Sequence, residues 1–220
     1  MIEAVIFDVD GTLVDTVDLH TAAWVQTFRA FGVQADYAEV RSQIGKGGDQ
    51  MMPVFLPAET IDLRGEEIEA FRSALYKREF MPRARAFDSV RPLFERLRAD
   101  GKRVVIGSSC KADELDVYLR LADVADLIDG AATGDDAEHT KPFPDIFEAA
   151  RAKVGVDASA TAVVGDSPFD AQAAVVAGMK PIGVLCGGFP EADLRAAGCV
   201  AIYAGPEDLL RRYEGSPLAG

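Results

Sequence analysis

The chain divides into regions with two different patterns of hydrophobic and polar residues. From residue 87 onward, short apolar runs alternate with stretches whose apolar residues recur at helical spacing, whereas residues 15–85 carry the helical spacing alone. One further apolar run, Ala4 to Phe7, precedes that helical region and is typical of a strand buried on both faces. Alternating strands and helices predict a parallel sheet covered by helices, so the first strand belongs to a core that a helical insertion interrupts.

The other core strands are predicted from later apolar runs. Helical stretches precede the first four of these runs, and a short helix from Pro206 follows the last. The runs lie at 103–107, 127–132, 161–165, 181–185 and 199–203.

The insertion is predicted to hold helices only. Asp15 or Thr16 can cap its first helix, and Gly32 closes that helix. The remaining elements expected there are a helical stretch at 37–44, a glycine-rich segment at 45–49, an amphipathic piece ending at Leu56, and a helix from about 66 to 80 that Pro82 breaks.

Composition and charge restrict the setting and the partners. With 220 residues, 49% of them hydrophobic and 27% charged, the chain can bury a full core, and no apolar run is long enough to cross a bilayer. No basic and apolar leader follows Met1, and the three cysteines lack a metal-type spacing, so we expect a cytoplasmic protein with reduced thiols. A net charge of −13 disfavours nucleic acid and anionic membranes as partners. A monomer or a homodimer is expected.

The first strand runs directly into two carboxylates, Asp8 and Asp10. Acids two apart on an extended chain point to the same side, at the end of a buried strand where a parallel sheet opens into a ligand crevice. Such close acids repel each other, and a metal ion or a raised pKa is the usual remedy. The alternative is a turn or a calcium loop, but the further oxygen ligands that an EF-hand needs do not follow between Asp10 and Trp24.

Polar groups also follow two later strands. The segment Ser108-Ser109-Cys110-Lys111 offers hydroxyls and backbone amides for a phosphate, although helix capping by serine is an equally good interpretation. Gly165-Asp166-Ser167-Pro168-Phe169-Asp170 places acids four apart, and Asp166 can alternatively be an N-cap. Lys141 precedes Pro142 and Pro144, which stiffen the backbone before a helix, and the alternative is a solvated side chain, as is usual for a lone lysine.

Together these residues resemble the haloacid dehalogenase superfamily of phosphotransferases. The four motifs stand in order along the chain, as Asp8-x-Asp10-Gly-Thr-Leu, Ser108, Lys141, and Gly165-Asp-Ser-x-x-Asp170. The resemblance implies an α/β fold: a Rossmann-like parallel-sheet core at residues 1–14 and 86–220, with an inserted α-helical cap domain at residues 15–85.

The resemblance also implies a mechanism. Asp8 would be the nucleophile that forms an aspartyl phosphate, and Asp10 would protonate the leaving group and then activate water. Ser108 and Lys141 would hold the phosphoryl oxygens. A dehalogenase is disfavoured, because those members of the superfamily lack the second aspartate.

A Mg²⁺ cofactor follows from the same resemblance. Its ligands would be the Asp8 carboxylate, the Asp10 carbonyl and the Asp166 carboxylate, and Asp170 would orient that shell from the second layer.

Substrate choice is expected in the cap and in the loop after Ser108. His20 can meet Asp10 or the substrate, whereas Trp24 lies on an apolar stripe and is better explained by core packing. Lys46 can bind a second anionic group or be solvated, and Ser109 and Lys111 are further candidates for binding the substrate.

The resulting hypothesis is a Mg²⁺-dependent phosphatase of small phosphorylated metabolites. A β-phosphoglucomutase-like activity is the alternative, disfavoured because the resemblance places Gly48 where mutases carry an arginine and Gly165 where they typically carry a glutamate. A Schiff-base hydrolase using Lys46 is a minor alternative, since a glycine-rich loop does not suggest a desolvated lysine. From another class, a catalytically idle binding or scaffold protein remains open.

Overall fold

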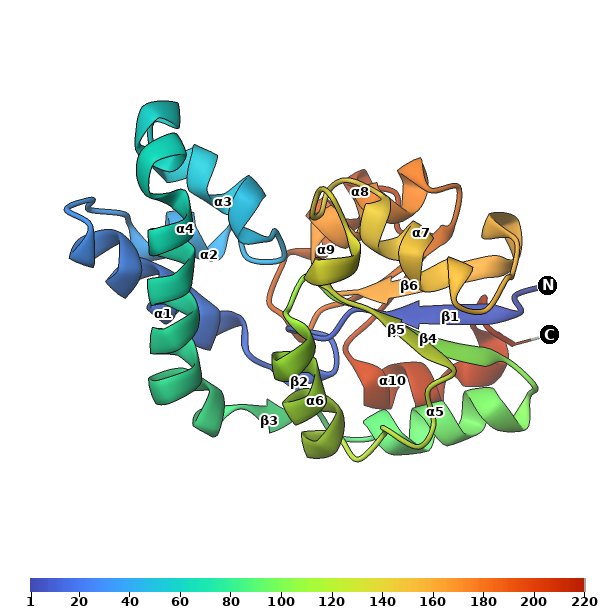
Figure 1. The fold of residues 1–220 in the computed structure, drawn as a ribbon. Helices are drawn as coiled ribbons and strands as arrows, with labels where there is room; N and C mark the ends of the chain where they lie inside the picture. The colour runs from blue at the N-terminus through green and yellow to red at the C-terminus, as the bar shows by residue number, and fades with distance from the viewer. Residues whose placement is uncertain (220) are drawn as a thin grey trace.

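The computed structural model describes residues 1–219 and contains a six-stranded parallel sheet with a helical lobe beside it (Figure 1). This arrangement confirms the predicted α/β class. The strand order is β5-β4-β1-β6-β7-β8. The strands are β1 (Ala4–Phe7), β4 (Arg103–Gly107), β5 (Gly130–Ala132), β6 (Thr161–Gly165), β7 (Lys180–Val184) and β8 (Ala201–Tyr203).

The strand β1 lies at the centre of the sheet, paired with β4 on one side and β6 on the other. After β1 the chain builds β4 and β5 outward on one side, and then returns to build β6, β7 and β8 on the other. The strand order therefore reverses beside β1. In parallel sheets such a reversal leaves a crevice at the carboxyl ends of the strands, and ligands bind there.

Helices cover both faces of the sheet (Figure 1). Alternate residues of β1 enter different apolar layers: Val5 and Phe7 pack in one cluster and Ile6 in the other. The first layer contains α5 (Val90–Ala99), α6 (Ala112–Leu121) and α10 (Pro206–Arg211), and the second contains α7 (Asp145–Ala152) and α8 (Pro168–Val176). Burial on both faces explains why β1 reads as a continuous apolar run.

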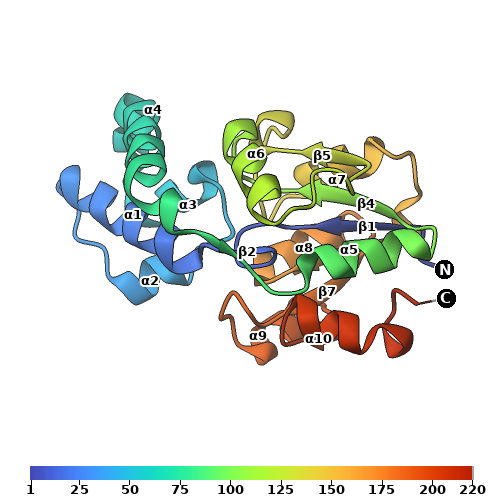
Figure 2. The same ribbon diagram turned by 90° about the horizontal axis from the view of Figure 1, so that it is seen from below.

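The helical lobe spans residues 17–83 and has an apolar cluster of its own, which includes Trp24, Phe28, Met51 and Ile68. Its elements are α1 (Val17–Ala30), α2 (Tyr37–Arg41), α3 (Gly48–Phe55), α4 (Ala58–Leu75), a π-helical turn η1 (Tyr76–Phe80) and a 3₁₀ turn η2 (Met81–Arg83). Two short strands, β2 (Val14–Asp15) and β3 (Arg85–Ala86), pair antiparallel where the chain enters and leaves the lobe. Both views place the lobe beyond the carboxyl ends of the strands (Figure 2).

Several predicted boundaries were wrong. The long helix of the lobe begins at Ala58 rather than near residue 66, the last strand begins at Ala201 rather than Cys199, and β5 contains only the end of the predicted 127–132 run. Leu127 and Ile128 instead pack on the core from a loop, so their apolar character reports burial and not a strand. The helix α9 (Glu191–Ala196) and the 3₁₀ turns η3 (Gly134–Asp136), η4 (Ala158–Ala160) and η5 (Tyr213–Gly215) were not predicted.

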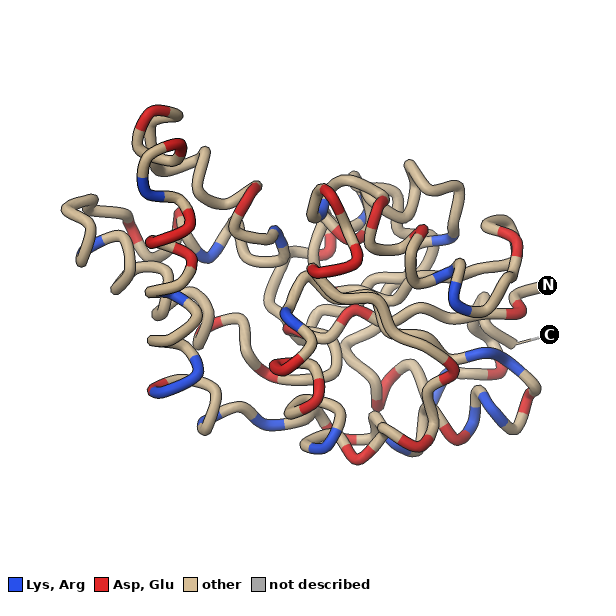
Figure 3. Tube along the Cα trace, in the orientation of Figure 1, with Lys and Arg blue, Asp and Glu red and all other residues tan. Residues whose placement is uncertain are grey.

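Charged residues of both signs are interspersed over the chain (Figure 3). On α5, basic side chains face acids of neighbouring segments: Arg91 lies 2.8 Å from Asp126, and Arg98 lies 2.8 Å from Asp129. Within residues 1–219, no helix is both long enough and apolar enough to cross a membrane.

Candidate active site

The carboxyl ends of the three central strands bring the predicted motif residues together. Asp8 follows β1, and its backbone N–H donates to the Val164 carbonyl of β6 at 2.9 Å. Ser108 follows β4 and Asp166 follows β6. Because parallel strands end at the same edge, residues more than 150 positions apart in sequence meet there: Thr12 Oγ1 donates to Asp166 Oδ1 at 3.3 Å.

Lys141 reaches this edge from the loop before α7 and is almost fully buried, with 1% of its surface exposed. Its Nζ donates to Asp8 Oδ1 and lies 2.7 Å from Asp170 Oδ1. Burial lowers the pKa of the Lys141 ammonium, but the charges of Asp170 and Asp8 outweigh burial and raise that pKa overall. The lysine is therefore a buried, charged group between two acids and not the solvated side chain of the alternative interpretation.

Asp8, Asp166 and Asp170 form a buried cluster of carboxylates whose oxygens lie within 4.8 Å of one another. Burial raises the pKa of Asp8 to about 7 against the effect of Lys141, and Asp170 and Asp10 add to the rise. Burial, with repulsion from Asp170 and Asp8, also raises the pKa of Asp166 well above its usual range. Three buried acids beside one lysine leave negative charge uncompensated, and an all-oxygen donor set of this kind suits a hard divalent cation.

The local sequence fixes the acids after β6. Ser167, and not Asp166, is the N-cap of α8, and a reciprocal capping box joins it to Asp170. The Ser167 hydroxyl donates to Asp170 Oδ2 at 2.6 Å, and the Ser167 N–H donates to the same oxygen at 3.1 Å. The capping alternative for Asp166 was therefore wrong, and its carboxylate is left available for the cluster.

Two glycines leave space for the Asp166 carboxylate. A Cβ at Gly11 or at Gly187 would overlap the Asp166 side chain. Gly11 also has φ +78°, a left-handed conformation that lets the chain turn directly after the acids.

Asp10 belongs to a different network. Its carboxylate accepts a hydrogen bond from Thr16 Oγ1 at 2.6 Å, and His20 Nε2 lies 2.9 Å from the same oxygen. Burial raises the pKa of Asp10, but the contacts with His20 and Thr16 outweigh burial and lower that pKa overall. Thr16 occupies the N-cap position of α1 but makes no side-chain cap bond, because its hydroxyl is directed to Asp10.

The His20 ring is fixed from a second side. It stacks on Tyr76 of η1, with ring centroids 3.9 Å apart and planes 8° apart. The Tyr76 and Tyr118 hydroxyls lie 2.5 Å apart, so this stack joins the lobe to α6 of the core. Of the two roles open for His20, the structure shows the contact with Asp10.

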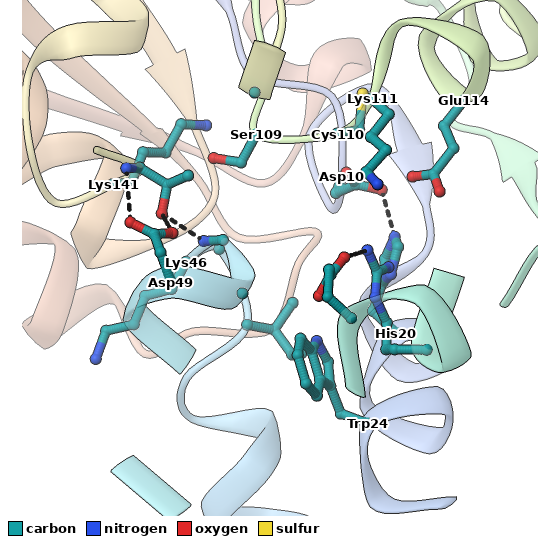
Figure 4. A pocket seen from close by; sticks show the side chains of 18 of the residues that line it. Asp10, His20, Trp24, Lys46, Asp49, Ser109, Cys110, Lys111, Glu114 and Lys141 are labelled. Atoms are coloured by element: carbon teal, nitrogen blue, oxygen red, sulfur yellow. Dashed lines mark hydrogen bonds and ion pairs between the residues drawn. The ribbon is translucent and has the colours of Figure 1, made fainter. Parts of the chain in front are cut away.

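A pocket of about 210 Å³ lies between the lobe and the acids (Figure 4). The core lines it with Asp8, Lys141, Ser109, Cys110, Lys111 and Glu114 among others. The lobe adds, among others, His20, Trp24, Lys46, Asp49, Glu69 and Arg72. Trp24 thus has two roles, since it packs in the lobe cluster and also borders the pocket.

The predicted phosphate and substrate residues differ in position. Ser109 and Lys111 line the pocket, whereas Ser108 is fully buried and its Oγ accepts from the Cys110 N–H at 3.2 Å. Lys46 also lines the pocket, but its Nζ donates to Gln43 Oε1 at 2.6 Å and lies 4.7 Å from the centre of the Phe169 ring.

Other pocket residues were not predicted from the sequence. The side chain of Asp49 accepts hydrogen bonds from the N–H and the hydroxyl of Thr140, next to Lys141. The Gly47 N–H donates to the Thr140 hydroxyl oxygen at 2.9 Å, so the loop before α3 rests on the core. Glu69, Arg72 and Glu114 carried no local signal beyond their charge on helices.

Comparisons with known proteins agree with this geometry. The family described as haloacid dehalogenase-like hydrolase matches residues 5–184. A phosphoglycolate phosphatase of Nitrosospira multiformis is 32% identical, with 91% of each chain covered. The fructose-1-phosphate phosphatase YqaB of Escherichia coli is 29% identical, covering 81% of this chain and 94% of its own. The crystal structure of a hydrolase from Pseudomonas syringae superposes with a TM-score of 0.88 at 28% identity, covering 97% of this chain and 98% of that one.

Proposed function

The chain belongs to the haloacid dehalogenase-like hydrolase family, and on this premise we propose that it is a Mg²⁺-dependent phosphatase of small phosphate monoesters. One observation carries the proposal. Asp8 is held by the buried Lys141 at the edge of a pocket, while a second aspartate, Asp10, stands in a separate network with a histidine. A nucleophile and a separately tuned acid and base are what two-step phosphoryl transfer requires.

In the first step, an Asp8 oxygen attacks phosphorus and the ester oxygen departs. The Lys141 ammonium leaves part of its contact with Asp8 and offsets the charge on the phosphoryl oxygens. The Ser108 segment, at the start of the loop that leads into α6, binds those oxygens from the other side.

Asp10 handles the protons. It donates a proton to the departing alkoxide, and then takes one from the water that cleaves the acyl phosphate and restores the Asp8 carboxylate. Thr16 and His20 hold the Asp10 carboxylate in place, and their hydrogen bonds favour its ionised form, which is left once Asp10 has given its proton to the alkoxide and which then activates water.

A divalent cation fits the acid cluster, since buried carboxylates with raised pKa values lack a sufficient counter-charge. Asp8 and Asp166 would hold Mg²⁺ with their carboxylates and Asp10 with its carbonyl, while Asp170, fixed by Ser167, would orient the site. The ion would supply the positive charge that lets one anion attack another.

Residues 15–85 act as a cap on a core formed by residues 1–14 and 86–220. The cap supplies the side of the pocket opposite the acids, so it determines which alcohol can accompany the phosphate and excludes water from the site. The two relatives above are named for different substrates, so their names do not specify the alcohol that this chain accepts. The alcohol has to be inferred from the residues that line the pocket.

The test is release of phosphate from p-nitrophenyl phosphate and from a panel of small esters, with Mg²⁺ or with EDTA. We expect Mg²⁺-dependent turnover in the wild type and none in Asp8→Asn, with Asp116→Asn, an exposed acid on α6, as the matched control. A rapid quench of the wild type should trap a phosphoryl group on Asp8. Isomerisation of β-glucose 1-phosphate without hydrolysis would favour the mutase instead, and no reaction of any kind would favour the binding protein.

A further inference from the structure

Several buried polar atoms in residues that line the pocket have no hydrogen-bond partner within residues 1–219. They are Glu69 Oε2, Arg72 Nε, Ser109 Oγ and Glu114 Oε2, and all four residues line the pocket. Buried polar groups are nearly always paired, so unpaired atoms in several residues that line one pocket point to a ligand that pairs them.

Glu69 and Arg72 lie one turn apart on α4 and bind each other. Arg72 Nη2 lies 2.5 Å from Glu69 Oε1, and the guanidinium lies 5.6 Å from the centre of the Trp24 ring. The second oxygen of Glu69 faces Gly48, where a Cβ would approach it to 2.6 Å. The glycine therefore leaves room for an acid on the cap side of the pocket.

Glu114 reaches the same side of the pocket from α6 of the core and is 1% exposed. Its Oε1 lies 3.5 Å from Ser73 Oγ and 3.7 Å from Lys77 Nζ, which leaves Oε2 without a partner among the described residues. Figure 4 shows the Glu114 side chain descending from α6 on the side of the pocket where Asp10 and His20 lie. The cap and the core thus contribute acids to one subsite.

The unpaired atoms specify the chemistry of the ligand. The two carboxylate oxygens accept hydrogen bonds, so the ligand must supply donors, whereas Arg72 Nε needs an acceptor. A hydroxyl group supplies both, and an ammonium group supplies donors only. A second anionic group would meet two carboxylates and an arginine whose charge Glu69 already balances.

Resting on the proposed phosphatase function, we propose that Glu69, Arg72 and Glu114 form a subsite for the hydroxyl groups of the alcohol. The chain then prefers phosphate esters of polyols to esters whose alcohol carries a carboxylate or a second phosphate. Specificity comes from the cost of leaving these buried groups unpaired when an alcohol lacks hydroxyls.

The preference is tested with phosphate esters of the same three-carbon length that differ in the groups on the alcohol. Glycerol 3-phosphate and 3-phosphoglycerate differ only by a hydroxymethyl group in place of a carboxylate, and n-propyl phosphate lacks the hydroxyls altogether. We expect kcat/KM for glycerol 3-phosphate to exceed both others by about tenfold or more. Phosphoethanolamine separates the hydroxyl from the ammonium alternative, and a preference for it or for 3-phosphoglycerate would overturn the proposal.

Hydrolysis of p-nitrophenyl phosphate shows whether a negative result refutes the phosphatase function or only the hydroxyl subsite. If no ester is hydrolysed, the phosphatase function itself fails. If p-nitrophenyl phosphate is hydrolysed with Mg²⁺ but the three aliphatic esters react at equal rates, the phosphatase function stands and the hydroxyl subsite is refuted.

The variants Glu69→Gln and Glu114→Gln test whether the preference for glycerol 3-phosphate depends on these two side chains. Each should lower kcat/KM for glycerol 3-phosphate about tenfold and change that for n-propyl phosphate less than about twofold. Glu66→Gln on α4 and Asp116→Asn on α6 are exposed controls on the same helices. Equal losses on both esters, or no loss on either, would refute the assignment, and Glu69→Gln alone decides it if Glu114→Gln fails to fold.

Discussion

Asp49→Ala should open the cap. In the structure the Asp49 carboxylate accepts two hydrogen bonds from Thr140, one from its N–H at 3.1 Å and one from its hydroxyl. Thr140 lies on the core beside Lys141, whereas Asp49 lies in the first turn of α3 in the lobe. The substitution removes both bonds, and it leaves in place the bond that the Gly47 N–H donates to the Thr140 hydroxyl.

The magnitude follows from the two lost bonds. Each hydrogen bond to a partly exposed group contributes on the order of 0.5–1.5 kcal/mol, so the docked state should lose about 1–3 kcal/mol relative to the open state. Because about 1.4 kcal/mol corresponds to a factor of ten, the open population should rise by a factor of roughly 5 to 140. The global free energy of unfolding should change little, since the open lobe keeps its own apolar cluster.

Amide hydrogen exchange at Gly47 measures this opening directly, because its N–H is bonded only while the loop rests on Thr140. Exchange at Gly47 should accelerate by the same factor as the open population, and kcat/KM for the preferred ester should fall as the closed state becomes rarer. Asp62→Ala, an exposed acid on α4, is the matched control. Gly47 exchange and kcat/KM both within twofold of the wild type would show that Asp49 does not hold the cap closed.

Two further outcomes test the metal site and the buried thiols. Gly187→Ala places a methyl group against Asp166, so the Mg²⁺ concentration for half-maximal activity should rise at least about tenfold, and an unchanged Mg²⁺ titration would contradict this placement. Burial raises the pKa of the Cys199 thiol to about 12 from an ordinary value of 9.0, so the folded state keeps a proton that the unfolded state loses between those values. The resulting contribution to the free energy of unfolding is fully present below pH 9 and is lost as pH rises, by at most about 1.4 kcal/mol per pH unit. Urea titrations at pH 8 and 10 should therefore show a smaller decline in the free energy of unfolding for Cys199→Ala than for the wild type. An equal decline in the variant would contradict the raised pKa.

The motif residues were predictable from sequence for a geometric reason. Parallel strands end at a common edge, so an acid after β1 and another after β6 must meet, whatever lies between them in sequence. The apolar runs located those strand ends well because they are buried on both faces. At Leu127, where the run is only partly buried, the same apolar signal did not mark a strand, and Cys199 is buried without belonging to one.

The partners of the acids were harder to predict, because local sequence does not encode where a helix docks. Thr16 has the sequence position of an N-cap, yet its hydroxyl is directed to Asp10 because the chain turns at Gly11. The stack of His20 on Tyr76 joins residues from the two ends of the lobe, and it exists only because η1 returns beside α1.

Glu69 and Glu114 show where sequence patterns stop being informative. A charged residue on an amphipathic helix ordinarily lies in water, and nothing in the spacing of α4 or α6 distinguishes these two from exposed neighbours such as Glu66 and Asp116. Glu114 lies against Ser73 and Lys77 of the lobe, so the desolvation of its carboxylate opposes closure unless a ligand supplies donors. On the proposed subsite, a substrate that offers hydroxyl groups should favour the closed cap, so that selection of the alcohol and closure of the site become one equilibrium.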